Sequence, residues 1–202
     1  MKPAICVLAL LALSAPAQAK DITIGFAIAK SGWMEAYDTP AATAAKIRID
    51  EINAAGGLLG RQIAVVEADT RTDRAGAAKA GLDLLDQGAQ MMIVSCDYDF
   101  GAPSALVAEG EAMISFFLCA EDVKAGIQGV GPLSFSSSVL APVQGATMAE
   151  WSHARREART AYVLEDTFIE YNKGICTGFE WMFPQLDGAS IVGRDSFKND
   201  DA

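Results

Sequence analysis

Four acidic residues follow two short apolar segments near the middle of the chain. Asp97 and Asp99 come after residues 91–94, and Glu121 and Asp122 come after residues 113–116. Carboxylates grouped in this way can transfer protons, or they can bind a ligand that carries an amine, amidine or amide group. Nothing in the sequence assigns separate acid and base roles. The structural alternative is that Asp99 caps a helix, as aspartate often does, while the other acids point to solvent.

Aromatic residues occur in the same predicted loops and at predicted helix starts. They are Trp33, Tyr37, Tyr98, Phe100 and Tyr171. Ligand sites are lined mainly by apolar and aromatic side chains that surround a few polar groups. We therefore expect these rings to stack on a ligand with a flat or apolar portion. The alternative is that they lie at the surface without contacting a ligand.

Catalytic and metal-binding motifs are missing from the sequence. His153 is the only histidine and falls within a predicted helix, which makes a Ser–His or Cys–His relay hard to assemble. The chain has no G-x-G-x-x-G after its first strand, no G-x-x-x-x-G-K-[ST] and no G-x-S-x-G. It also has no C-x-x-C pair, which together with the lone histidine argues against zinc. We expect neither catalysis nor a metal or cofactor.

Strand and helix patterns alternate along the chain, as they do in α/β proteins with a parallel sheet and helices on both faces. Asp38 or Thr39 is expected to cap the first helix, and Gly56 and Gly57 to end it, because glycine adopts the left-handed conformation that closes a last turn. Asp73 is expected to cap the second helix. The third helix is expected to begin near residues 101–103, and a fifth strand to cover 133–136.

The first 19 residues have the pattern of a signal peptide. Lys2 is followed by an apolar stretch over residues 5–13, and the Ala17-Gln18-Ala19 site places cleavage after Ala19. We therefore expect a soluble, exported chain. Its net charge of −10 argues against nucleic acid or an anionic membrane surface as a partner.

Two cysteines each follow a predicted strand. If the strands that precede Cys96 and Cys119 are parallel neighbours, both sulfur atoms lie at the same sheet edge, within reach of a disulfide. Export to an oxidising compartment favours that pairing. Free buried thiols are the alternative.

Residues 50–63, with the sequence DEINAAGGLLGRQI, carry a helix end, two glycines, two apolar residues, a third glycine and a strand start. This pattern closely resembles the first βαβ unit of type 1 periplasmic solute-binding proteins. The nearest branch is the branched-chain amino-acid-binding (Leu/Ile/Val-binding) family, the receptor subunits of ABC importers. The resemblance implies doubly wound parallel sheets in two hinged lobes. We expect lobe 1 over residues 20–140, the hinge near residue 140, and the start of lobe 2 over 141–202.

The resemblance also implies a binding site at the strand ends. Tyr37 falls where family members pack an aromatic ring on the ligand, and Tyr171 approximates a lobe-2 tyrosine that closes over it. Tyr98 falls where a small hydroxyl residue binds the ligand carboxylate. Ala120 and Glu121 fall on a pair that contacts the bound amino acid. Further residues expected at the site come from the loop after the third strand, namely Asp99, Phe100 and Gly101.

Tyr98 departs from the family pattern because it is bulky, so capture of a carboxylate must differ or be absent. Family members are about twice as long, and we expect this chain to be a fragment of a longer reading frame rather than a truncated product. The implied function is that of a monomeric periplasmic receptor that delivers a small polar solute to an ABC permease in the inner membrane. The alternative is a sensor module of the same fold that controls a signalling partner.

Overall fold

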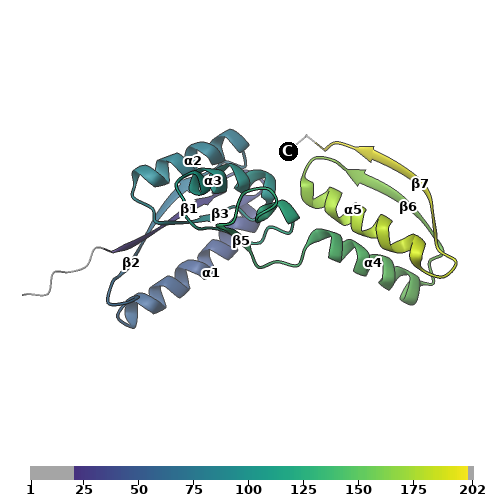
Figure 1. Ribbon diagram of the computed structural model, residues 1–202, viewed down its shortest axis with the longest axis horizontal. Coiled ribbons are helices and arrows are strands. Elements are labelled where there is room, and N and C mark those ends of the chain that lie inside the picture. The colour runs from purple at the N-terminus through teal and green to yellow at the C-terminus, as the bar shows by residue number, and fades with distance from the viewer. Residues whose placement is uncertain (1–20, 200–202) are drawn as a thin grey trace, which may run out of the picture.

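The computed structural model describes residues 21–199. The predicted signal peptide, residues 1–19, lies outside this range. Within it, no helix is both long enough and apolar enough to cross a bilayer. Two separate parallel sheets organise the described chain, and Figure 1 shows them side by side along the long axis of the molecule.

The larger sheet has five parallel strands in the order β2-β1-β3-β4-β5. Their bounds are β1 Ile22–Ile28, β2 Ile63–Asp69, β3 Met91–Val94, β4 Ser115–Phe117 and β5 Ser134–Ser136. Because all five strands run in the same direction, their carboxyl ends meet at one edge, where the following loops converge. The predicted alternation of strands and helices is therefore confirmed for this part.

Helices cover both faces of this sheet (Figure 1). Helix α1 (Glu35–Ala54) packs on one face, where Ala42 and Ile49 bury Phe26 and Ile28 of β1. Helices α2 (Arg74–Asp86) and α3 (Tyr98–Gly110) pack on the other face, over a core that includes Leu84. The apolar spacing of these helices requires burial on one side, and the sheet supplies the partner surface.

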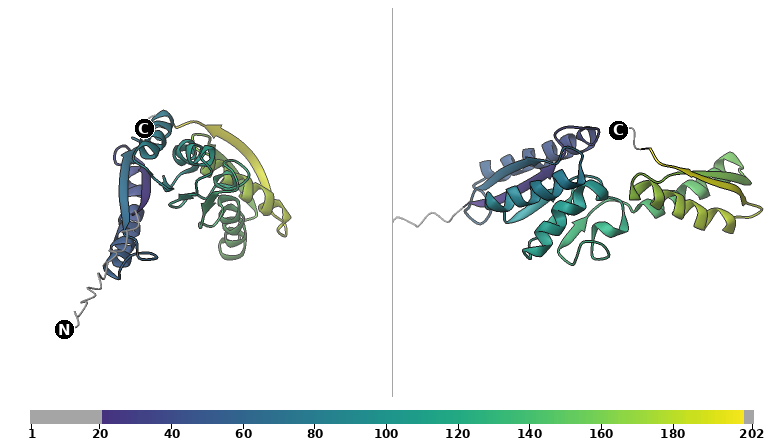
Figure 2. Two further views of the ribbon diagram at one scale, coloured as in Figure 1. Left: turned by 60° about the vertical axis from the view of Figure 1, so that its left-hand side comes forward. Right: turned by 90° about the horizontal axis from the view of Figure 1, so that it is seen from above.

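The second part of the chain forms a smaller sheet with its own helices. Its elements are α4 Ala141–Arg156, β6 Thr160–Asp166, α5 Glu170–Met182, the short 3₁₀ helix η2 Phe183–Gln185, and β7 Ser190–Phe197. Strands β6 and β7 pair in parallel, α5 packs on β6, and α4 packs on α5. Figure 2 shows this part joined to the larger sheet by the segment between β5 and α4, which contains residue 140.

The start of α1 differs from the sequence-based expectation. The helix begins at Glu35, three residues before the expected cap, and the side chain of Met34 makes no capping bond. Asp38 is fully buried and accepts hydrogen bonds from the backbone N–H groups of Ala29 and Cys96, each at 2.7 Å. This carboxylate therefore joins α1 to the ends of β1 and β3 instead of capping a helix.

The start of α3 also lies earlier than expected. The helix begins at Tyr98, and the N-cap is Asp97, which accepts the backbone N–H of Asp99 at 2.8 Å. The alternative in which Asp99 caps this helix is therefore wrong, because the turn forms two residues sooner. Other predicted helix limits are confirmed: Asp73 caps α2, and Gly56 and Gly57 have φ angles of 105° and 82° just after α1.

Candidate functional site

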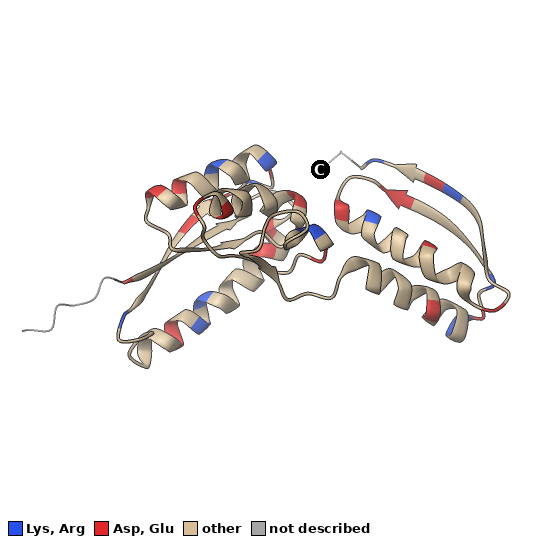
Figure 3. Ribbon diagram, viewed as in Figure 1, with Lys and Arg blue, Asp and Glu red and all other residues tan. Residues whose placement is uncertain are grey.

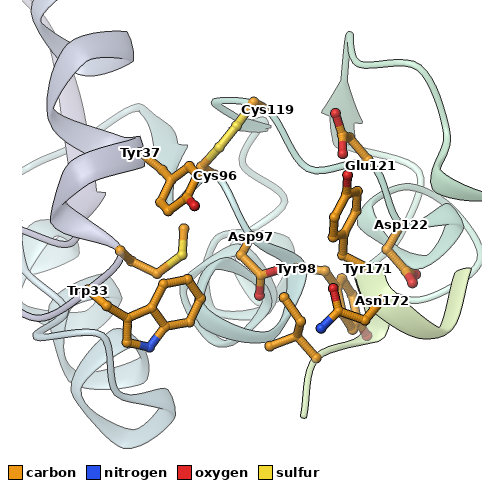
Figure 4. Close-up of a pocket in the computed structure, with 12 residues that line it drawn as sticks. Trp33, Tyr37, Cys96, Asp97, Tyr98, Cys119, Glu121, Asp122, Tyr171 and Asn172 are labelled. Atoms are coloured by element: carbon orange, nitrogen blue, oxygen red, sulfur yellow. A yellow bond between two sulfur atoms is a disulfide. The ribbon is translucent and has the colours of Figure 1, made fainter. Parts of the chain in front are cut away.

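A cavity of about 390 Å³ lies between the two parts of the chain, at the carboxyl end of the larger sheet. Figure 4 shows that side chains from both parts surround it. The lining residues are Trp33, Met34 and Tyr37 near the start of α1, Cys96, Asp97 and Tyr98 after β3, Cys119, Glu121 and Asp122 after β4, and Ile169, Tyr171 and Asn172 after β6. This volume lies at the small end of the usual range for ligand sites.

A disulfide between Cys96 and Cys119 forms part of the cavity wall. Val94 of β3 pairs with Phe117 of β4, so each cysteine lies two residues beyond a register pair. That register brings the two Cα atoms to 4.4 Å from each other. Cys176 on α5 is free. The disulfide joins the two loops that carry the acidic residues of the site.

Three carboxyl groups line the cavity, and two of them are buried. Asp97 and Asp122 are each more than nine-tenths buried, and Glu121 is partly buried. Figure 4 shows Asp97 near the middle of the site, with Glu121 and Asp122 on one side. The alternative in which these acids point to solvent therefore does not hold for Asp97 and Asp122.

Burial and a neighbouring charge change the acidity of Asp97. Desolvation raises its pKa from 3.8 to about 7, and the negative charge of Asp99 adds to the rise. Hydrogen bonds from the backbone N–H groups of Asp99 and Phe100, and the charge of Arg74, act in the opposite direction. Asp97 therefore keeps its proton to a much higher pH than an ordinary aspartate does.

The tyrosines reach the cavity from three elements. Tyr171, at the start of α5, is directed toward Glu121, and its hydroxyl donates to Gln144 at 3.3 Å. Burial raises the pKa of Tyr171, and the charge of Glu121 raises it further. The Tyr98 ring stacks on Phe117 with centroids 6.5 Å apart. Tyr37 is more than half exposed at the edge of the site.

Four residues expected at the site lie outside the cavity lining. Asp99 makes an ion pair with Arg74 at 2.5 Å, and Phe100 is buried against Trp33 and Phe168. Gly101 packs against the Phe117 ring, where a Cβ atom would be only 2.6 Å away. Ala120 is buried, and its carbonyl accepts the Ser136 hydroxyl. These residues support the wall from behind.

Contacts across the two parts close one side of the cavity. Phe168 and Ile169, in the loop before α5, pack against the cluster that contains Trp33, Cys119 and Phe100. Lys124 after β4 makes an ion pair of 2.5 Å with Glu170 on α5. In Figure 3, acidic positions lie on both sides of this junction.

Sequence reasoning missed several residues of the lining. Met34, Ile169 and Asn172 contact the cavity but were not expected there. Asn172 follows Tyr171 in the first turn of α5, so its position next to an expected residue was the available signal. Among the residues that the structure describes, no group of three or more His, Cys, Asp or Glu side chains is placed to hold a metal ion.

A family model described as periplasmic binding protein matches residues 21–202. The chain belongs to this family. The predicted resemblance is thereby confirmed, and the two parallel sheets have the type I periplasmic binding protein fold. The family is a class of solute-binding proteins.

This periplasmic binding protein is similar to several solved structures. The substrate-binding protein LivJ of a branched-chain amino acid transporter from Streptococcus pneumoniae, in complex with isoleucine, shares 26% identity at a TM-score of 0.79, and the match covers 90% of this chain and 51% of LivJ. The leucine-binding protein LivK from Thermotoga maritima shares 22% identity at a TM-score of 0.74, with coverage of 89% and 50%.

A more distant match shows that the fold accommodates other ligands. A solute-binding protein of an ABC transporter from Rhodopseudomonas palustris, in complex with 3,4-dihydroxybenzoic acid, shares 15% identity at a TM-score of 0.72, with coverage of 88% and 47%. This periplasmic binding protein spans about half the length of these structures. A comparison with curated proteins gave no match.

Proposed function

We propose that this chain is the substrate-binding component of an ABC-type importer and captures a small polar solute, such as an amino acid, an amine or an amide, between its two lobes. The observation that carries the proposal is the cavity lined by Tyr98, Glu121 and Tyr171, in which strand-end loops from both sheets meet. We place lobe 1 over residues 20–140 and the beginning of lobe 2 from residue 141. The ligand-bound form is then delivered to a permease in the inner membrane.

The connection between the lobes fits a hinge. Residues 137–140 separate β5 from α4 and have no regular structure, and the backbone N–H of Ala141 donates to the Glu121 carbonyl at 2.7 Å. Rotation about this segment moves α5 and its cavity residues relative to lobe 1. Ligand stabilises the closed form only if it binds that form more tightly than the open one.

Thermal-shift screening of the purified chain tests the binding function. The solutes are aliphatic amino acids, glutamate, amides, polyamines and small aromatic acids. We expect at least one to raise the melting temperature in a concentration-dependent way, and mass spectrometry to recover it chemically unchanged. Trp33→Ala should abolish the shift, whereas Trp181→Ala, which removes an exposed indole on α5, should keep it. Conversion of the bound solute into product would contradict the proposal.

Delivery to a permease needs a separate measurement. Uptake of the identified solute into membrane vesicles that contain the cognate permease and ATPase should depend on added chain. Uptake that is equally fast without the chain would remove the transport role while leaving the binding role intact.

A further inference from the structure

The charged side chains that line the cavity in the described residues are all acidic: Asp97, Glu121 and Asp122. No lysine or arginine within residues 21–199 lines it. Lys124 lies nearby, with its Nζ 5.8 Å from the centroid of the Tyr98 ring, but it is already paired with Glu170. A ligand that enters the site therefore meets negative charge first.

Several of the backbone donors that commonly hold anions at helix starts are already bonded within the protein. Asp97 accepts the N–H groups of Asp99 and Phe100 at the start of α3. Asp122 accepts the N–H of Lys124 at 2.7 Å, and the N–H of Glu170 at the start of α5 donates to Asp99 at 2.8 Å. A ligand carboxylate would have to displace one of these carboxylates to reach the same donors.

Aromatic rings complete the lining around the acids. Trp33 lies in the turn before α1, and Tyr37, Tyr98 and Tyr171 lie on α1, α3 and α5. Figure 4 shows Asp97 between the Trp33 side and the Tyr171 side of the site. Rings of this kind attract a cation through their faces and also pack on flat or apolar groups. The combination of buried carboxylates and aromatic faces suits a positively charged group attached to an apolar body.

We propose that the cavity selects a small organic cation, an ammonium or amidinium group on a flat or apolar body, and discriminates against ligands that carry a free carboxylate. This inference rests on the proposed binding function and narrows it to one ligand class. Asp97 and Glu121 contact the cationic group, and the aromatic rings hold the body.

The two ligand classes respond in opposite ways to pH. The groups near Asp97 are Asp99 and Arg74 behind it, and Glu121 and Asp122 across the cavity. Since the pKa of Asp97 is about 7, raising the pH from 5.5 to 8.5 increases its negative charge. Affinity for a cation should rise over this interval and then level off, whereas affinity for a carboxylate should fall.

Calorimetric titration with matched ligands tests the selection. Leucine is compared with 3-methylbutylamine, which lacks its carboxylate, and with 4-methylpentanoate, which lacks its amine. Phenylalanine, 2-phenylethylamine and 3-phenylpropanoate form a second series. We expect the amine of at least one series to bind roughly tenfold or more tightly than its amino acid and carboxylate, a difference of about 1.4 kcal/mol. Equal or tighter binding of the amino acid or carboxylate would overturn the inference.

Two isosteric variants locate the charge that is responsible. D97N keeps a capping oxygen at the start of α3, and E121Q keeps the size of its side chain. Each should weaken amine binding at least about tenfold, and D97N should also flatten its pH dependence. The matched control is D73N, which changes the N-cap of α2 outside this cavity and should bind the amine like the unchanged chain. Equal effects of D73N and D97N would contradict the assignment.

Failure of this inference can be distinguished from failure of the proposed function. A chain that binds leucine but neither amine is still a binding protein, and only the cation selection is then wrong. A chain that binds no member of either series refutes the cation selection. If the thermal-shift screen is also negative, the binding function itself is refuted.

Discussion

The backbone N–H of Glu170 donates a hydrogen bond of 2.8 Å to the Asp99 carboxylate, which joins the first turn of α5 to the first turn of α3. The other oxygen of Asp99 makes an ion pair with Arg74 at 2.5 Å. One carboxylate therefore links both parts of the chain, behind the wall of the cavity. Because this bond crosses between the two parts, the hinge motion proposed above would break it.

Replacing Asp99 with alanine should favour the open form. The variant loses an acceptor for the Glu170 N–H, and a hydrogen bond to a charged group contributes about 1.5–3 kcal/mol. We expect a larger radius of gyration by small-angle X-ray scattering and a loss of roughly tenfold or more in ligand affinity. R74Q removes the ion pair but leaves the acceptor, so its effect should be clearly smaller. Equal effects of the two variants would contradict a role for the Glu170 bond.

Asp38→Ala should lower the free energy of unfolding. Asp38 is buried and accepts the N–H groups of Ala29 and Cys96, which alanine would leave without an acceptor. Each unsatisfied buried group costs about 1–3 kcal/mol, so we expect a loss of roughly 2–5 kcal/mol in urea denaturation. Asp50→Ala changes an exposed position on the same helix and should alter stability by less than about 0.5 kcal/mol. A similar free energy of unfolding for both variants would exclude this role of Asp38.

The disulfide should support both stability and ligand binding. C119S opens the link between Cys96 and Cys119, which are 23 residues apart, and should cost about 2–4 kcal/mol. Ligand affinity should also fall, because the freed loops carry Asp97 and Glu121. C176S removes the free cysteine and is the control for loss of a sulfur atom. Unchanged stability and affinity in C119S would show that the link is dispensable.

Asp97 should make stability depend on pH. Burial raises the pKa of its carboxyl to about 7 in the folded chain, whereas the ordinary value is 3.8. The folded state therefore binds this proton more tightly than the unfolded state does. The resulting stabilisation is complete below about pH 3.8 and is lost as the pH rises to about 7.

The asparagine of D97N cannot ionise, so the variant does not lose stability through ionisation at this position. Its free energy of unfolding, relative to the unchanged chain, should increase between pH 4 and pH 7 and stay level above that range. Urea denaturation at four pH values measures the difference, with D73N as the baseline. If the free energy of unfolding of D97N, relative to the unchanged chain, falls as the pH rises, the pKa of Asp97 is not raised in the folded state.

Gly178→Ala should disturb the packing of α4 on α5. A Cβ atom at this position would lie 1.9 Å from the carbonyl oxygen of Pro142, so the helices must separate. Overpacking of this kind costs about 1–3 kcal/mol, which thermal denaturation can measure. Gly110→Ala is the control, because nothing lies within 4 Å of a Cβ atom there. Equal stability of the two variants would contradict a close helix contact at Gly178.

The helix starts show where local pattern was insufficient. Asp38 precedes Thr39 and Pro40, a sequence typical of a cap, yet its hydrogen-bond partner Cys96 is 58 residues away. Asp97 and Asp99 are both plausible caps, and the choice between them depends on where β3 ends. When a side chain accepts a hydrogen bond from a distant backbone N–H, the residues next to it in the sequence do not indicate that bond.

The sequence by itself determined the family, through its resemblance to solute-binding proteins, and the alternation of strands and helices, and it favoured the pairing of Cys96 with Cys119. The alternation of elements follows from hydrophobic periodicity and turn residues, which act over short stretches of chain. Only the tertiary structure decided that Asp97 faces the cavity while Asp99 binds Glu170 of the second part. That division depends on the position of α5 and on burial, and both arise from contacts between residues far apart in the chain.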